Sequence, residues 1–166
     1  MFMKKNIGKI LAVILVVALL ATVLCACVPS KFTKAKENLE GDNYVVTVVG
    51  NGDLVNGANA AAKVAAAAYD VTLTGKCDNI VTGVSKDGKQ SVTIYYFDNA
   101  KDAKAFNKAC KANVKKAKDE LKKQKDAGNI SEDDYKKALE EMKDVKFGAS
   151  GKAFYYGTKA GVKAAN

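Results

Sequence analysis

The chain opens with one long uncharged stretch, and short amphipathic segments follow it. Residues 10–24 carry no charge, and three lysines, Lys4, Lys5 and Lys9, precede them. These fifteen residues have the length of a signal-peptide core and are short for a free-standing membrane span, which needs about 20. The pattern therefore predicts a signal helix at the N-terminus, followed by the folded part of the protein.

Beyond residue 30 the spacing of apolar residues alternates between the period of a helix and that of a strand. Helical spacing predicts helices over residues 31–41, 58–69 and 99–127, a helix beginning after Ser131, and a last short helix over 157–165. Runs of β-branched and aromatic residues predict strands over residues 44–49, 80–86, 91–97 and 152–156, with a further short strand over 71–74.

Local signals fix how some of these elements join. Asp87-Gly88-Lys89 is a hairpin turn between the two central predicted strands. Both faces of segment 91–97 are apolar, which is typical of a central strand that is covered on both sides. Ser131 and Asp134 form a capping box, with Ile130 and Tyr135 as its hydrophobic staple.

This order of elements predicts an α+β fold: a mainly antiparallel sheet of four to five strands, packed by helices. A Lys-rich helical hairpin over residues 99–143 belongs to it. We divide the chain into a signal peptide (1–26), a lipidated cysteine with a short tether (27–31) and a single domain (32–166).

The end of the uncharged stretch carries a candidate processing site. Leu24-Cys25-Ala26-Cys27 resembles a bacterial lipobox, in which a small residue precedes an obligatory cysteine. The resemblance implies diacylglycerol on the Cys27 thiol, cleavage before Cys27 by signal peptidase II, and a location on the extracytoplasmic face of the cell membrane. Two or more acyl chains hold a protein stably on a bilayer. An uncleaved membrane anchor is the alternative.

Two further resemblances concern the folded part. The lipobox together with segments 34–48, 95–106 and 154–163 resembles small lipoproteins of Firmicutes, which implies a location and no particular activity. Segment 121–143, with its Ala127-Gly128-Asn129-Ile130-Ser131 turn, resembles the short helical hairpin called SHOCT. A generic well-capped helix turn explains the same residues.

Composition excludes several kinds of chemistry. The sequence has no His and no Arg, so all 27 basic residues are lysines. Nucleophilic triads that use imidazole, zinc and haem sites that use His, and bidentate Arg clamps on phosphate are therefore absent. We expect no cofactor, no metal and no enzymatic activity.

The lysines offer a candidate binding surface. Lys108, Lys111, Lys115 and Lys122 could hold a polyanion, such as teichoic acid, anionic lipid headgroups or extracellular DNA. An ordinary solvated helix face is the alternative. Specific nucleic-acid binding is not expected, because Arg and a platform of exposed aromatics are missing.

Cys77 and Cys110 remain after processing. An extracytoplasmic pair can form a disulfide. Two buried thiols are the alternative, since the sequence does not give the distance between them.

These features together predict a non-catalytic binding module at the cell envelope, anchored in the cytoplasmic membrane. Its partner would be an anionic envelope polymer or a protein. The alternative is an envelope enzyme that uses carboxylates or a Ser-Lys pair without His or metal.

Overall fold

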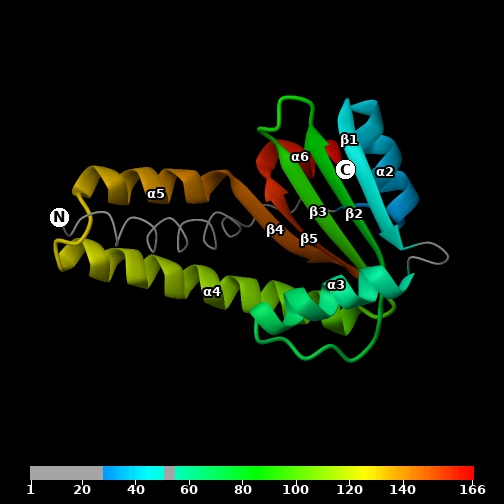
Figure 1. Cartoon of the computed structure of the whole chain (residues 1–166), viewed down its shortest axis with the longest axis horizontal. Coiled ribbons are helices and arrows are strands. Elements are labelled where there is room, and N and C mark those ends of the chain that lie inside the picture. The colour runs from blue at the N-terminus through cyan, green and yellow to red at the C-terminus, as the bar shows by residue number, and fades with distance from the viewer. Residues whose placement is uncertain (1–27, 51–54) are drawn as a thin grey trace.

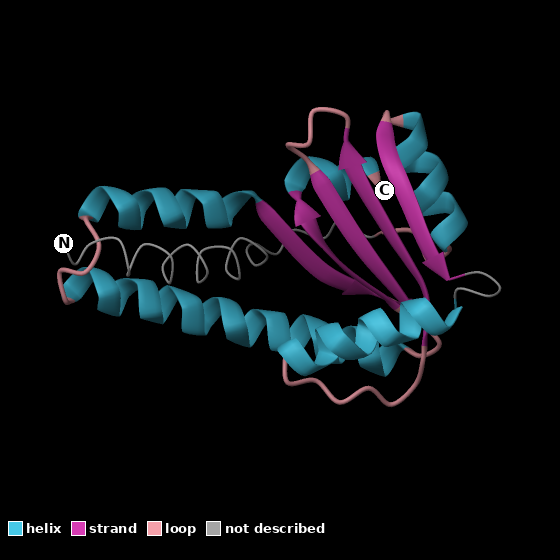
Figure 2. Cartoon of the chain, viewed as in Figure 1, coloured by secondary structure: helices cyan, strands magenta, loops and turns pink. Residues whose placement is uncertain are grey.

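The computed structural model describes residues 28–50 and 55–166 and has an α+β fold (Figures 1 and 2). One antiparallel sheet has the strand order β1-β2-β3-β5-β4, which confirms the predicted fold class. The strands are β1 (Tyr44–Gly50), β2 (Cys77–Ser85), β3 (Ser91–Phe97), β4 (Val145–Ser150) and β5 (Ala153–Thr158). The helices are α2 (Phe32–Gly41), α3 (Val55–Ala68), α4 (Ala100–Asp126), α5 (Glu132–Asp144) and α6 (Lys159–Ala164).

The predicted strand over residues 71–74 is wrong. The backbone N–H of Val71 donates to the carbonyl of Ala66, and that of Thr74 donates to the Asp102 carboxylate, 2.9 Å away. These donors are therefore taken by a helix end and by a side chain, and the segment runs as a loop.

The edge strand β4 was not predicted. Its sequence, Val-Lys-Phe-Gly-Ala-Ser, contains one β-branched residue and a glycine, and it follows α5 directly. Pairing with β5, from Val145 opposite Thr158 to Ser150 opposite Ala153, makes it a strand. The tertiary partner thus overrides a weak local preference for the strand conformation.

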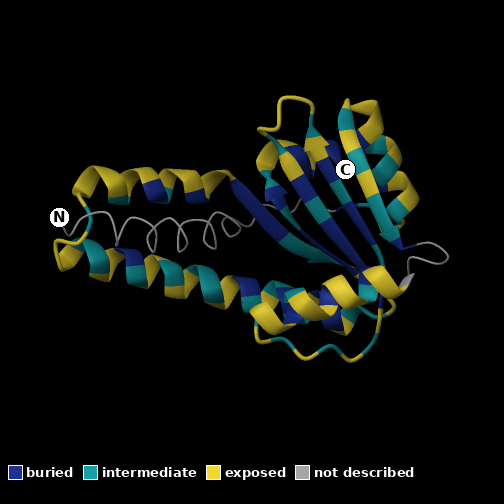
Figure 3. Cartoon of the chain, in the orientation of Figure 1, coloured by how far each residue is buried: buried dark blue, intermediate teal, exposed yellow. Residues whose placement is uncertain are grey.

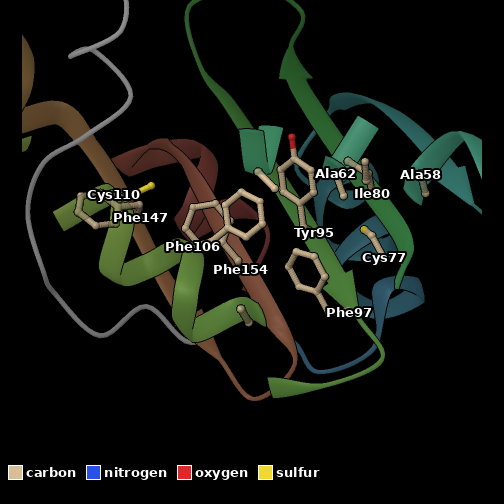
Figure 4. Packing of buried hydrophobic residues seen from close by; sticks show 12 residues of the cluster. Ala58, Ala62, Cys77, Ile80, Tyr95, Phe97, Phe106, Cys110, Phe147 and Phe154 are labelled. Carbon is tan, nitrogen blue, oxygen red and sulfur yellow. The ribbon is translucent and has the colours of Figure 1, made fainter. Parts of the chain in front are cut away.

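One face of the sheet is covered by α3 and α4. Figure 4 shows an aromatic cluster on this α3/α4 face, to which α4 contributes Phe106. The Phe106 ring lies 5.2 Å from the Phe154 ring and 6.0 Å from the Tyr95 ring, between centroids. Small side chains on α3, Ala58, Ala62 and Ala66, join the same core. Their size allows the helix to approach the strands closely.

The opposite face is covered by α2 and α6. Leu39 of α2 and Val162 of α6 pack on this α2/α6 face against Val81 and Ile94 of the central strands. Gly161 lets α6 approach β3, because a Cβ at this position would collide with the backbone carbonyl of Ser91. The two cores explain why β3 is apolar on both sides.

Helices α4 and α5 form a hairpin that projects beyond the sheet (Figure 1). A small core of Leu121, Ala138 and Met142 holds the projecting part together. The predicted cap is confirmed: Ser131 Oγ accepts from the Asp134 N–H at 3.0 Å. Ile130 and Tyr135 both pack against that small core. Among the described residues, no helix is both long and apolar enough to cross a bilayer.

Candidate functional site

The four lysines singled out from the sequence lie on one side of α4. Lys108, Lys111, Lys115 and Lys122 are spaced by three, four and seven residues, and all four are exposed. This spacing places them on the same side of a helix. The opposite side of α4 is buried through Phe106, Cys110 and Leu121. We call these four residues the lysine stripe; Figure 3 shows the exposed side of α4 in yellow.

Few acids accompany this stripe. Helix α4 contains ten lysines and four acids, and residues 103–118 contain six lysines and no acid. In the part of the chain that the structure describes, Lys125 is the one lysine of α4 in an ion pair within 4.0 Å. The positive charge of the stripe is therefore available to a ligand. It is strongest before Asp119, which lies between Lys115 and Lys122.

One of the four acids of α4, Asp102, is buried and stabilises the fold. The Asp102 carboxylate is fully buried and accepts hydrogen bonds from the backbone N–H groups of Thr74 and Gly75, both at 2.9 Å, and from Asn99 Nδ2 at 3.1 Å. Burial alone would raise the pKa of Asp102, but these hydrogen bonds outweigh it and lower the pKa. Asp102 therefore ties loop 70–76 to α4 and does not neutralise the lysine stripe. No local sequence pattern predicts this role of Asp102; the nearest signal is Asn99, three residues earlier, which caps the helix.

The segment that leads from the candidate lipidation site is held against the domain. Val28 is 2% exposed and belongs to the core of the α2/α6 face. Tyr96 Oη donates to the Pro29 carbonyl at 3.1 Å, and the Tyr96 ring meets Phe32 edge-on. The sequence predicts a tether over residues 28–31, but this segment begins inside the core, because Val28 is buried there. The lipobox residues Leu24, Cys25, Ala26 and Cys27 lie outside the described residues.

A shallow hollow of about 320 Å³ adjoins this segment. Lys31, at the start of α2, and Lys152, before β5, line it together with Tyr96 and one carboxylate, that of Asp78. Glycoside hydrolysis by carboxylates uses a pair of such groups, whereas Asp78 is the one carboxylate among the residues that line this hollow. No local pattern predicts that Lys31, Asp78 and Lys152 lie together, because they are far apart in the chain.

Cys77 and Cys110 are both free thiols and both buried. They lie at opposite ends of the aromatic cluster in Figure 4. Burial raises the pKa of each thiol to about 12, so neither is a reactive thiolate near neutral pH. Of the two alternatives, the structure has the buried thiols and not the disulfide.

Within residues 28–50 and 55–166, no group of three or more Cys, Asp or Glu side chains is arranged to hold a metal ion. Comparisons of the chain with protein-family models, curated proteins and solved structures find no match. The resemblances to small Firmicutes lipoproteins and to SHOCT therefore stay predictions. The lysine stripe and the docked segment 28–31 are the two features of the described chain from which a function can be argued.

Proposed function

We propose that this protein is a lipid-anchored, non-catalytic module on the extracytoplasmic face of the cell membrane, and that its lysine stripe binds an anionic polymer of the envelope. The observation that carries the binding part is the exposed, unpaired stripe on α4. The proposed anchor is diacylglycerol on Cys27, supported by the lipobox pattern.

The spacing of the stripe suits a polymer better than a small anion. Lys108 and Lys122 are fourteen residues apart on one helix, which corresponds to about 21 Å along its axis. Lysine is a compact point charge that does not need a fixed ligand geometry. Several phosphates along a flexible chain can therefore contact the stripe at once, and their effects add through high local concentration.

The test is a binding titration with a defined polyanion. Wall teichoic acid of the polyglycerol phosphate type is the probe, and Lys108→Gln, Lys111→Gln, Lys115→Gln and Lys122→Gln are combined in one variant. We expect its affinity to fall by about tenfold or more, since four attractive charges are removed. All four positions are exposed, so the fold should persist.

A charge-matched control distinguishes binding at the lysine stripe from general attraction by the net positive charge of the protein. Lys34, Lys36, Lys136 and Lys143 each form an ion pair with a glutamate, and changing all four to Gln removes the same formal charge. We expect this control to bind nearly as well as the unaltered protein. Equal losses in both variants would show attraction by overall charge only, and no loss in the stripe variant would refute the proposal.

The anchor is tested separately by intact mass and detergent partitioning after expression in a Gram-positive host. We expect a mature chain that begins at Cys27 and carries diacylglycerol, and loss of both features in Cys27→Ser. An unprocessed chain that still partitions with membranes would instead favour the uncleaved anchor.

A further inference from the structure

The candidate anchor and the lysine stripe belong to opposite faces of the sheet. Val28, the residue after Cys27, packs with Val81 and Ile94 in the core of the α2/α6 face. Phe106 and Cys110 of α4 pack in the core of the α3/α4 face, on the other side of the same strands. Figure 1 shows α3 and α4 on one side of the sheet, with α6 behind it.

There is little free chain between the anchor and this core. Val28, the neighbour of the candidate lipidation site in the sequence, is 2% exposed, and one residue spans only about 3.8 Å of chain. The hydrogen bond from Tyr96 to the Pro29 carbonyl holds the next residue as well. A lipid on Cys27 would thus attach at the surface of the domain and restrict its rotation above the bilayer.

The surface around this attachment point suits anionic headgroups. Lys31 and Lys152 line the hollow beside the segment together with one acid, Asp78. Lys159 and Lys163 are exposed on α6. In the described part of the chain, none of these four lysines has an ion pair within 4.0 Å. Lysines held near an anionic membrane surface are attracted to its headgroups.

We propose that the α2/α6 face rests on the headgroup layer of the membrane, and that the lysine stripe is consequently turned away from the bilayer toward the wall. This inference rests on the proposed anchor at Cys27. It also selects among the candidate ligands of the stripe: lipid headgroups would be out of reach, and a polymer that extends from the wall would be accessible.

The orientation is tested with the mature lipidated protein in vesicles that contain phosphatidylglycerol and a headgroup spin-labelled lipid. A fluorophore is attached at Thr33→Cys, at the start of α2, or at Ala112→Cys, on the exposed side of α4; both positions are exposed. Cys77 and Cys110 are buried thiols that do not compete for the label. We expect quenching at position 33 to exceed that at position 112 by about threefold or more, because headgroup contact requires proximity to the anchored face.

Insertion of a long Gly/Ser segment between Cys27 and Val28 serves as the matched control. It keeps the lipid but frees the domain, and we expect the difference in quenching to disappear. Equal quenching of the two labels in the uninserted protein, or stronger quenching at position 112, would overturn the orientation while leaving the anchor intact. A product without diacylglycerol by intact mass would overturn both the anchor and the orientation.

Discussion

Asp102 shows how a charged residue can be buried at low cost. Its carboxylate is fully buried, yet it accepts hydrogen bonds from two backbone N–H groups, the Thr74 hydroxyl and the Asn99 amide. Buried charges are tolerated when hydrogen bonds replace the lost water. All these donors are uncharged, so the Asp102 carboxylate is stabilised without an ion pair to a lysine of α4.

Replacing Asp102 with Ala should lower the free energy of unfolding at pH 7 by about 3 kcal/mol, because several buried donors lose their acceptor. The pKa of Asp102 is lowered in the folded state. Its stabilisation is therefore complete above the unfolded pKa of about 4 and is lost as the pH falls through the folded value. Urea unfolding at pH 7 and at pH 3 should show a smaller difference from the unaltered protein at pH 3.

The control for this prediction is Asp119→Ala, at an exposed acid of the same helix. It should change stability by less than about 0.5 kcal/mol. If Asp102→Ala were as mild as this control, the carboxylate would not be what holds loop 70–76.

At the scale of elements, α4 contributes both to the core and to the proposed binding surface. Its apolar side enters the aromatic core near the sheet and the small core of Leu121, Ala138 and Met142 farther out. Its polar side carries the lysine stripe. The projecting part is held by this small core and by contacts of Lys125 with Glu132 and Tyr135 of α5. We therefore expect it to open more easily than the sheet, which has a larger core on each face.

Leu121→Ala tests this expectation. Leu121 is 2% exposed, and its truncation leaves a cavity that should cost the hairpin about 2–4 kcal/mol. Hydrogen exchange measured by mass spectrometry should become faster in α5 and in the outer part of α4, while β2 and β3 stay protected. Lys118→Ala, at an exposed position of the same helix, should leave both regions unchanged.

Faster exchange across β2 and β3 in Leu121→Ala would contradict this prediction. It would mean that the hairpin and the sheet unfold as a single cooperative unit.

For the whole molecule, apolar packing stabilises the fold, whereas exposed positive charge is responsible for the proposed binding. The two cores lie on either side of one sheet, whereas the lysines of the stripe are at the surface. Screening by salt weakens attraction between exposed charges and leaves buried apolar contacts almost unchanged. Binding and stability should therefore respond differently to ionic strength.

Raising NaCl from about 0.1 M to about 0.5 M should weaken polyanion binding by tenfold or more. The free energy of unfolding should change by less than about 1 kcal/mol over the same range. Titrations with wall teichoic acid and urea unfolding at each salt concentration provide the measurement. Binding that is independent of salt would exclude the stripe as the principal contact.

The sequence by itself determined the elements with strong periodic patterns. The central strands, the long helix α4, the cap at Ser131 and the side of α4 that carries the lysines follow from local spacing and turn chemistry. These features depend on residues close together in the chain, so no tertiary partner is needed to recognise them.

Only the tertiary structure decided the rest. Strand β4 exists because β5 pairs with it, and segment 71–74 is a loop because Ala66 and Asp102 take its N–H groups. The two buried thiols and the placement of Val28 in the α2/α6 core likewise depend on residues far apart in sequence. A local pattern fixes which side of a helix is polar, but the packing of both helix layers on one sheet decides that the stripe and the start of the domain lie on opposite faces.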